Sequence, residues 1–119
     1  SLFREKLEKA DTEENAAVLE SFKKHFQPQP GFRCNYCIRI EGKKKKLVVE
    51  VQNAQLQLNY GKTEQIAMDI QIKKKVFEEI MNGRMTFQRA FMAGDMKMKG
   101  DFKILRTLDQ IFVFLDGNV

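Results

Sequence analysis

Few residues in this sequence could perform catalysis. His25 is the only histidine, and Ser21 lies four residues before it, on the same face of a predicted helix. A serine and a histidine act together as nucleophile and base only with a third group that orients the ring and with an oxyanion site. The sequence indicates neither, so we expect His25 to lie at a solvated helix end.

The acidic residues do not form a catalytic pair either. Glu78 and Glu79 fall on the outer side of a predicted helix, Asp95 in a turn and Asp101 at a helix start. General acid–base catalysis requires a positioned group with a tuned pKa, whereas these carboxylates should be solvated. The sequence also contains no Gly-rich phosphate loop of the Walker or dinucleotide type. We therefore predict that the protein is not an enzyme and uses no cofactor.

The two cysteines are predicted to be chemically passive. Cys34 and Cys37 are three residues apart in one strand-like run, so their side chains point to opposite faces and do not readily bridge each other. Two thiols and one histidine fall short of the four ligands of a structural zinc site, so no metal is expected. Reduced thiols are typical of intracellular proteins, and no apolar run is long enough to cross a membrane. We expect a cytoplasmic protein.

Positive charge is the feature that points toward partners. Lysines 43–46 and 73–75 form two clusters in a chain with a formal net charge of +5. Such clusters attract the phosphates of nucleic acid or of anionic lipid. The aromatic residues that would stack on bases fall on the buried sides of strands, and no RNA-recognition signature is present, so we expect no nucleic-acid partner. Two explanations remain, solvated lysines or a transient contact with an anionic membrane.

The elements that position these residues follow from hydrophobic periodicity. Residues 1–26 have a helical pattern with a break near Asp11, where Asp11 and Glu14 fit a capping box, and a main helix over 12–26. Apolar residues then alternate within 32–41, 47–52, 55–60, 65–72 and 96–98, which predicts five half-buried strands. Helices would cover the apolar face of this sheet. We predict one α+β domain over residues 1–119 with a five-stranded, mostly antiparallel sheet.

Three more helices are expected near the end of the chain. A helix over 76–81 ends at Gly83, where a residue in the left-handed conformation is expected, and a shorter helix carries Phe87 and Phe91. Asp101 is predicted to cap a third helix, whose apolar residues occupy positions 105–115.

The methionines are concentrated in one part of the sequence. All six lie between residues 68 and 98, and Phe77, Phe87 and Phe91 lie among them. Methionine is unbranched and polarisable, so it fills irregular space and adapts to partners of varied shape. The cluster therefore indicates either a loosely packed core or the wall of a cavity for an acyl chain or a sterol.

One spacing pattern in this region consists of Gly83, Ala90-Phe91, Gly94, Met96-Lys97-Met98-Lys99-Gly100-Asp101, Leu108 and Ile111-Phe112. It resembles the closing motif of the sterol carrier protein 2 family, in which a strand ending in Gly-Asp lies between a short helix with Ala-Phe and an amphipathic C-terminal helix. The resemblance implies about four or five helices over one face of the sheet, with an apolar tunnel between the layers. Met96 and Met98 replace the family's usual Leu or Ile, and Phe87 stands where relatives often have Pro.

The resemblance implies non-catalytic binding or transfer of a fatty acid, fatty acyl-CoA, sterol or other lipid. Together with the methionine cluster, it predicts ten ligand-binding residues: Met68, Phe77, Ile80, Met81, Phe87, Phe91, Met96, Met98, Leu108 and Phe112. The alternative is a protein–protein interaction or dimerisation module. It would use the C-terminal helix, which is apolar on more than one side over 111–115 and would either cap the pocket mouth or meet a second subunit.

Overall fold

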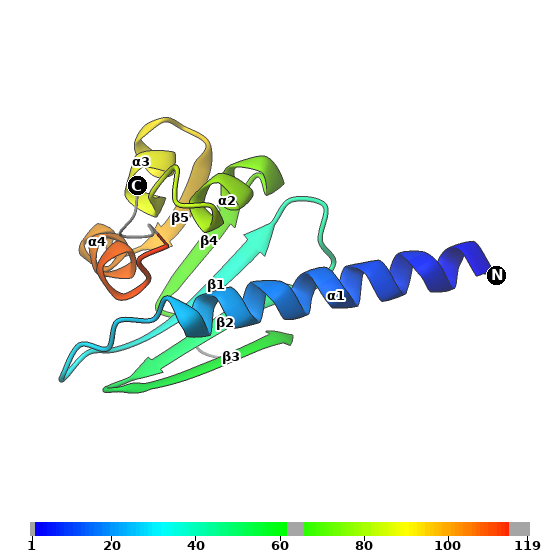
Figure 1. Ribbon diagram of the computed structural model, residues 1–119. Coiled ribbons are helices and arrows are strands. Elements are labelled where there is room, and N and C mark those ends of the chain that lie inside the picture. The colour runs from blue at the N-terminus through cyan, green and yellow to red at the C-terminus, as the bar shows by residue number, and fades with distance from the viewer. Residues whose placement is uncertain (1, 62–65, 115–119) are drawn as a thin grey trace.

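The structure is a computed structural model that describes residues 2–61 and 66–114. The elements, in chain order, are α1 (Leu2–Lys24), β1 (Arg33–Ile40), β2 (Lys46–Gln52), β3 (Gln55–Gly61), β4 (Met68–Ile72), α2 (Lys74–Met81), α3 (Phe87–Met92), β5 (Met96–Gly100) and α4 (Phe102–Ile111). The five strands form one sheet in the order β3-β2-β1-β4-β5, with helices over one face (Figure 1). The α+β prediction is confirmed, and the described part of the chain contains four helices.

The sheet is mostly antiparallel, as predicted, with one parallel pair. β1 and β4 run parallel, with Ile38 opposite Ile70, whereas β1–β2, β2–β3 and β4–β5 pair antiparallel. Tyr36 lies between Val49 on one side and Met68 on the other, and all three side chains are buried. Every second residue of each strand points to the same face as these three residues, because successive side chains of a strand alternate between its two faces. The residues on this face form the core.

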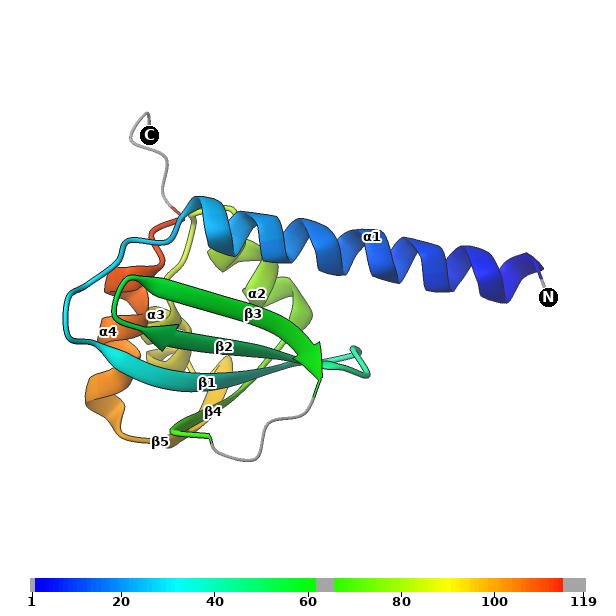
Figure 2. The ribbon, with the colours of Figure 1, turned by 90° about the horizontal axis from the view of Figure 1, so that it is seen from below.

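The helices divide the apolar face of the sheet between them. α1 passes over the β3–β2 side, and α2, α3 and α4 cover the side formed by β1, β4 and β5 (Figures 1 and 2). The first half of α1 extends beyond the sheet (Figure 2). The Phe22 ring joins α1 to the rest of the core, with its centroid 4.9 Å from that of Phe112, 5.2 Å from that of Phe114 and 6.2 Å from that of Phe77.

The predicted break in the first helix is wrong, because α1 runs without interruption from Leu2 to Lys24. Asp11 does not cap a new helix there. Its Oδ1 accepts a hydrogen bond from Lys43 Nζ at 2.6 Å, so a residue far away in the sequence engages the carboxylate. The Glu, Lys, Leu and Ala residues around this position also favour helix continuation.

The predicted extent of the last helix is also wrong. α4 ends at Ile111, and Phe112 has extended backbone angles of φ −123° and ψ 100°. The chain there pairs with the segment that follows α1, since Val113 N donates to His25 O at 3.1 Å and Gln27 N donates to Ile111 O at 2.7 Å. Backbone pairing with this segment therefore replaces the last predicted turn. Leu115 lies outside the described residues.

The predicted caps of the other helices are confirmed. Gly83 has φ 76° and donates to Ile80 O at 3.0 Å, while Arg84 N donates to Glu79 O at 2.9 Å, which is the Schellman pattern. Asp101 Oδ1 accepts from Lys103 N at 3.0 Å at the start of α4.

Candidate functional site

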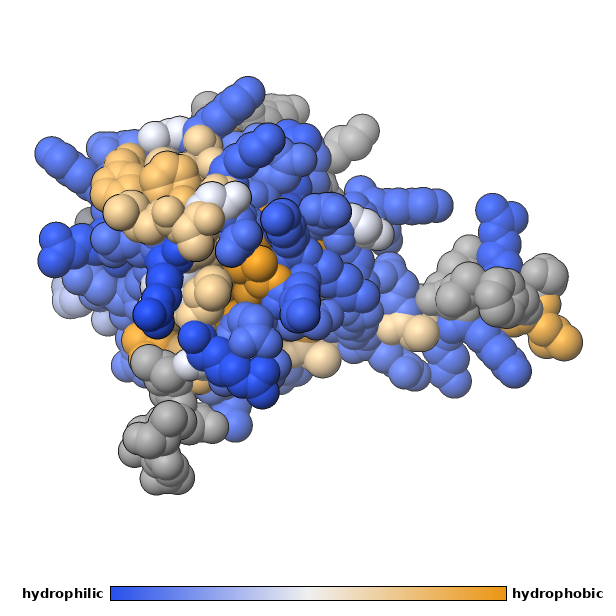
Figure 3. Space-filling model, turned by 90° about the horizontal axis from the view of Figure 1, so that it is seen from above, coloured by the Kyte–Doolittle hydropathy of each residue, from blue (hydrophilic) through white to orange (hydrophobic). Residues whose placement is uncertain are grey.

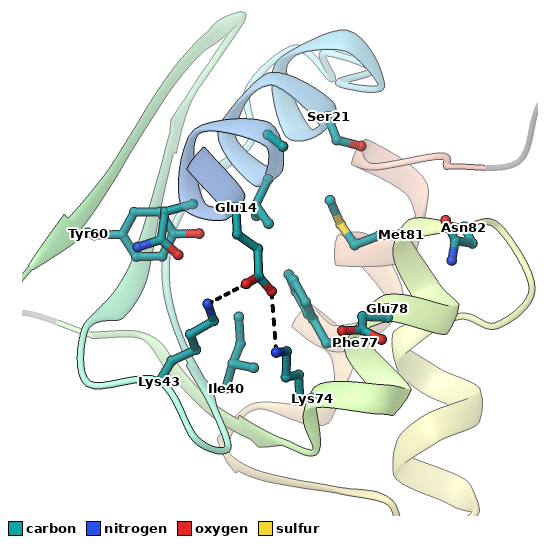
Figure 4. A pocket seen from close by; sticks show the side chains of 13 residues that line it. Glu14, Ser21, Ile40, Lys43, Tyr60, Lys74, Phe77, Glu78, Met81 and Asn82 are labelled. Atoms are coloured by element: carbon teal, nitrogen blue, oxygen red, sulfur yellow. Dashed lines mark hydrogen bonds and ion pairs between the residues drawn. The ribbon is translucent and has the colours of Figure 1, made fainter. Parts of the chain in front are cut away.

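A pocket of about 350 Å³ lies between α1, α2 and the sheet (Figure 4). Val18, Ile40, Phe77 and Met81 give it an apolar wall. The other lining residues are Glu14, Asn15, Ala17, Ser21, Lys43, Tyr60, Lys74, Glu78 and Asn82. A mostly apolar hollow of this size with a few polar groups is typical of a small-molecule site.

Two helix faces with the same residue spacing form opposite sides of this pocket. Residues 14, 17, 18 and 21 of α1 line it, and so do residues 74, 77, 78 and 81 of α2. This i, i+3, i+4, i+7 pattern places four side chains on one stripe of a helix. Each stripe begins with a charged residue, Glu14 or Lys74, and contains apolar side chains, while Glu78 adds a second charge to the α2 stripe.

A chain of ion pairs lies along the edge of the pocket. Lys43 Nζ in the β1–β2 loop is 2.6 Å from Asp11 Oδ1 and 2.9 Å from Glu14 Oε2, and Lys74 Nζ is 3.6 Å from Glu14 Oε1. Figure 4 shows Glu14 between the two lysines. These contacts tie α1 to the β1–β2 loop and to α2, and thus hold the helices on both sides of the pocket.

These contacts alter the acidity of the groups that make them. Hydrogen bonds from Lys43 lower the pKa of the Asp11 and Glu14 carboxyls below their ordinary values. Burial opposes the charge on Lys43, but its hydrogen bonds to the two carboxylates outweigh burial and raise the pKa of its ammonium group. All three groups are therefore charged near neutral pH.

Tyr60 brings an unsatisfied hydroxyl to the pocket. Its OH is buried and has no hydrogen-bond partner among the described residues. Burial raises the pKa of Tyr60 to about 12, so the phenol stays neutral and can both donate and accept. A buried polar group without a partner is energetically costly, so a bound molecule with a polar atom in reach would relieve that cost.

Ser21 and His25 are not arranged for nucleophilic catalysis. His25 Nδ1 lies 2.8 Å from the carbonyl oxygen of Ser21, to which it can only donate, and 3.4 Å from Ser21 Oγ. A nitrogen that donates to a carbonyl cannot accept the serine proton. The described residues also contain no group of three or more metal-ligating side chains.

The sequence model of the SCP-2 sterol transfer family matches residues 5–113. The chain belongs to this family. No curated protein matches the chain by sequence.

Solved structures show where this fold recurs. Sterol carrier protein-2 like-3 from Aedes aegypti superposes with a TM-score of 0.62 at 16% identity, covering 81% of this chain and 92% of that one. Sterol carrier protein 2 from Yarrowia lipolytica gives 0.57 at 20% identity, covering 77% and 70%. The sec-alkylsulfatase Pisa1 from Pseudomonas sp. gives 0.62 at 17% identity, but the match covers 73% of this chain and 14% of the sulfatase. These likenesses concern the fold.

Two of the ten residues predicted for the ligand site line the pocket of this SCP-2 domain. They are Phe77 and Met81, both on α2. The other eight do not line it. Met68, Ile80, Phe87, Met96, Leu108 and Phe112 are buried between sheet and helices, and Phe91 and Met98 are partly buried beside that core. Whether these eight contact a ligand remains a prediction.

The remaining residues of the pocket were not predicted as site residues. Val18 lies on the apolar stripe of the first helix. Ile40 and Tyr60 lie on the buried sides of two strands. Hydrophobic periodicity therefore assigned all three to the core. Their position at the ends of these apolar patterns, next to the charged Glu14 and Lys43, is the signal that could have located the pocket. None of these eleven residues is distinguished by residue type alone.

Proposed function

We propose that this SCP-2 domain binds and transfers a lipid, and that the pocket between α1, α2 and the sheet is where the ligand enters. The observation that carries the proposal is the combination of an apolar wall, built by Val18, Ile40, Phe77 and Met81, with an unsatisfied Tyr60 hydroxyl. An amphiphile matches both features, because its chain contacts the wall while a polar atom meets the phenol.

The ligand class is that of fatty acids, fatty acyl-CoA, sterols and similar lipids. The domain would act by excluding water from the hydrocarbon, without covalent chemistry. About ten buried methylenes at roughly 0.8 kcal/mol each offset the cost of association and leave micromolar affinity. A solved relative from Aedes aegypti, 15% identical, is described as palmitated, which supports an acyl chain as ligand.

The buried methionines and phenylalanines would form the continuation of the site. Phe77 lines the pocket and also lies against Phe22 in the core. If the flexible Met81 side chain turns aside, an acyl chain can advance from the pocket toward Ile80. This is how we envisage the ten predicted residues acting as one tunnel.

The site can be tested by filling it. Ala17 lines the pocket and is exposed, whereas Ala16 is exposed on a different side of α1. Ala17→Trp should abolish uptake of a fluorescent fatty acid, and Ala16→Trp should bind like the wild type. Native mass spectrometry after mild purification should show bound lipid in the wild type. A clean unliganded mass, together with no fatty-acid binding, would refute the proposal.

The interaction-module alternative has weaker support. Phe112 and Phe114 of the apolar C-terminal segment are buried against Phe22. Within 111–114, only Val113 is exposed, at 38%, and could contact a second copy of the chain. Val113→Glu should break any homodimer seen by sedimentation while lipid binding continues. Loss of a dimer with lipid binding intact would favour the alternative as the main role, and a wild type that sediments as a monomer would contradict it.

The compartment is part of the same proposal. Cys34 and Cys37 are both free and buried. Free thiols in a small domain are typical of a reducing environment, so we assign the protein to the cytoplasm. None of the described helices is both long and apolar enough to cross a membrane.

A further inference from the structure

An exposed aromatic and methionine surface lies on α3 and α4. Met92 is 72% exposed and Phe102 43% exposed, and the ring centroids of Phe91 and Phe102 are 5.6 Å apart. We call these three residues the α3–α4 patch. Figure 3 shows a light-orange area over α3 and the turn after it, bordered by hydrophilic side chains. Most large apolar side chains of the described residues are buried, so this concentration calls for an explanation.

Three cations lie beside the patch. Arg89 is three residues before Met92 on α3, and Arg106 is four residues after Phe102 on α4, so each shares a helix face with an exposed apolar side chain. Lys103 is next to Phe102 at the start of α4. All three are exposed, and none forms an ion pair with any residue in 2–61 or 66–114.

The acidic residues of the same region are engaged elsewhere. Asp95 pairs with Lys73 at 3.6 Å, and Asp101 accepts from the backbone of Lys103 at the N-cap of α4. Asp109 accepts from two backbone amides of α3. Arg89, Lys103 and Arg106 thus have no ion-pair partner among the described residues, and their side chains are available to an external anion.

The two lysine clusters singled out in the sequence differ from this surface. Lys43 and Lys74 are paired with carboxylates of α1, and Lys73 is paired with Asp95. None of the exposed large apolar residues found among the described residues belongs to 41–46 or 73–75. Those clusters can attract anions at a distance but offer nothing to insert into a lipid layer.

We infer that the α3–α4 patch is the surface by which this domain docks on an anionic lipid membrane. Met92 and Phe102 enter the headgroup region, and Arg89, Lys103 and Arg106 contact the lipid phosphates. Aromatic side chains flanked by basic residues are the usual composition of such interfacial surfaces. An acidic protein segment fits less well, since the exposed Met92 and Phe102 would gain little from a purely ionic partner. The inference rests on the proposed function, since it names the surface through which a lipid carrier reaches its donor or acceptor membrane.

Co-sedimentation with vesicles tests the inference. The full chain is mixed with phosphatidylcholine vesicles with or without 30% phosphatidylserine. We compare the wild type with Met92→Ser/Phe102→Ser and with Lys103→Glu/Arg106→Glu. The matched control is Lys44→Glu/Lys45→Glu in the β1–β2 loop, which changes the net charge equally at exposed positions.

The wild type should bind the anionic vesicles and not the neutral ones. Each cation near an anionic surface contributes about fivefold in partition, so Lys103→Glu/Arg106→Glu should reduce binding about 30-fold or more. Met92→Ser/Phe102→Ser should reduce it about tenfold, and the loop control less than about fivefold. Binding by the wild type should also weaken as salt increases.

Several outcomes would overturn the inference. They are no vesicle binding by the wild type, an equal loss in the loop control, or full binding by Met92→Ser/Phe102→Ser. Binding to polyglutamate without vesicle binding would make this a protein-docking surface instead. All substituted positions are exposed, so thermal unfolding should change little, with the largest change for Phe102→Ser, which removes the ring contact with Phe91. Lys103→Gln/Arg106→Gln provides a milder pair if a glutamate variant unfolds.

Fatty-acid uptake in the absence of vesicles separates this inference from the proposed function. All patch variants should take up fluorescent fatty acid like the wild type. Uptake without vesicle binding would overturn the docking inference alone. Vesicle binding without uptake would overturn the proposed function and leave a membrane-docking domain.

Discussion

Asp109 on α4 accepts a hydrogen bond from the backbone amide of Phe87, the first residue of α3, at a distance of 2.7 Å. Its other oxygen accepts from Gln88 N at 2.9 Å, and Thr86 Oγ1 accepts from Arg89 N at 3.1 Å. The first three backbone amides of α3 thus all donate to side-chain oxygens. Two of these oxygens belong to Asp109 on α4, and the third belongs to Thr86 at the N-cap of α3. This explains how a helix of six residues remains ordered and fixed against α4.

Asp109→Ala should therefore destabilise the protein by about 2 kcal/mol, because two helix-end amides lose their partner. Asp109→Asn keeps one accepting oxygen and should cost about half as much. Urea unfolding at pH 7 measures both. Equal stabilities for the wild type and the alanine variant would show that water replaces the carboxylate without cost.

The acidity of Asp109 adds a pH signature to this comparison. Burial raises the pKa of Asp109, although the two amides favour its charged form. A carboxyl with a raised pKa binds more protons in the folded state than in the unfolded one, so its contribution to stability falls as pH rises from its ordinary value of 3.8 through the raised one. The stability curve of Asp109→Asn should lack this fall.

Lys43→Met should loosen α1 from the β1–β2 loop. Asp11 and Glu14 are partly exposed, so we expect a loss of only about 1 kcal/mol at low salt and less at high salt. The pKa values of both carboxyls are lowered in the fold, so their contribution is present above the ordinary values of 3.8 and 4.5 and is lost as pH falls through the lowered ones.

The measurement for Lys43→Met is thermal unfolding between pH 7 and pH 3, with Lys44→Met as the control that removes an exposed lysine of the same loop. The wild type and the control should lose stability toward low pH more steeply than Lys43→Met. Parallel curves for all three proteins would contradict the coupling.

Tyr60→Phe should leave the stability of the unliganded protein unchanged or slightly higher, because it removes a buried hydroxyl without a partner. It should weaken binding of a fatty acid several-fold while leaving binding of a hydrocarbon of equal length unchanged. Tyr36→Phe is the matched control, since its hydroxyl is also buried without a partner but does not line the pocket. Calorimetric titration of all three proteins measures the difference.

Gly100→Ala should be the more harmful of two glycine substitutions. A Cβ at Gly100 would lie 2.6 Å from the carbonyl oxygen of Ala67, and φ there is 135°. We expect a loss of about 3 kcal/mol, against about 1 kcal/mol for Gly42→Ala, where φ is 86° and no atom lies within 4 Å of the added carbon. Urea unfolding ranks the two variants. Equal losses would show that the β4–β5 edge moves apart easily.

Local patterns in the sequence were sufficient for most of the fold. Alternation over β1 separates the buried Tyr36 and Ile38 from the exposed Arg33 and Arg39, and this pattern needs no partner to be recognised. Gly83 and Asp101 determine helix ends through backbone conformation and a single hydrogen bond. Such signals lie within a few residues of the feature that they predict, which is why they were reliable.

The errors arose where distant residues compete for a local signal. Asp11 has the spacing of a cap, but Lys43, more than thirty residues away, engages its carboxylate. The apolar pattern of the last helix continues beyond Ile111 and predicts a longer helix. The backbone of Val113 instead pairs with that of His25, and this keeps the chain extended. The pocket has the same origin, because α1, α2 and two strands converge there from distant parts of the chain. A short stretch of sequence cannot predict this pocket, because the residues that line it are far apart in the chain.

The bridge between Phe26 and Phe112 joins the end of α1 to a segment more than eighty residues later. On the ribosome, Phe22 emerges early but has to wait for Phe112 and Phe114, its closest ring partners, until almost all of the described chain has been made. Until that segment is made, α1 lacks two of the ring contacts that fix it to the core. The pocket wall supplied by α1 is thus held in place partly by the segment that follows α4, and a chain without Phe112 and Phe114 would lack the ring contacts that seat Phe22.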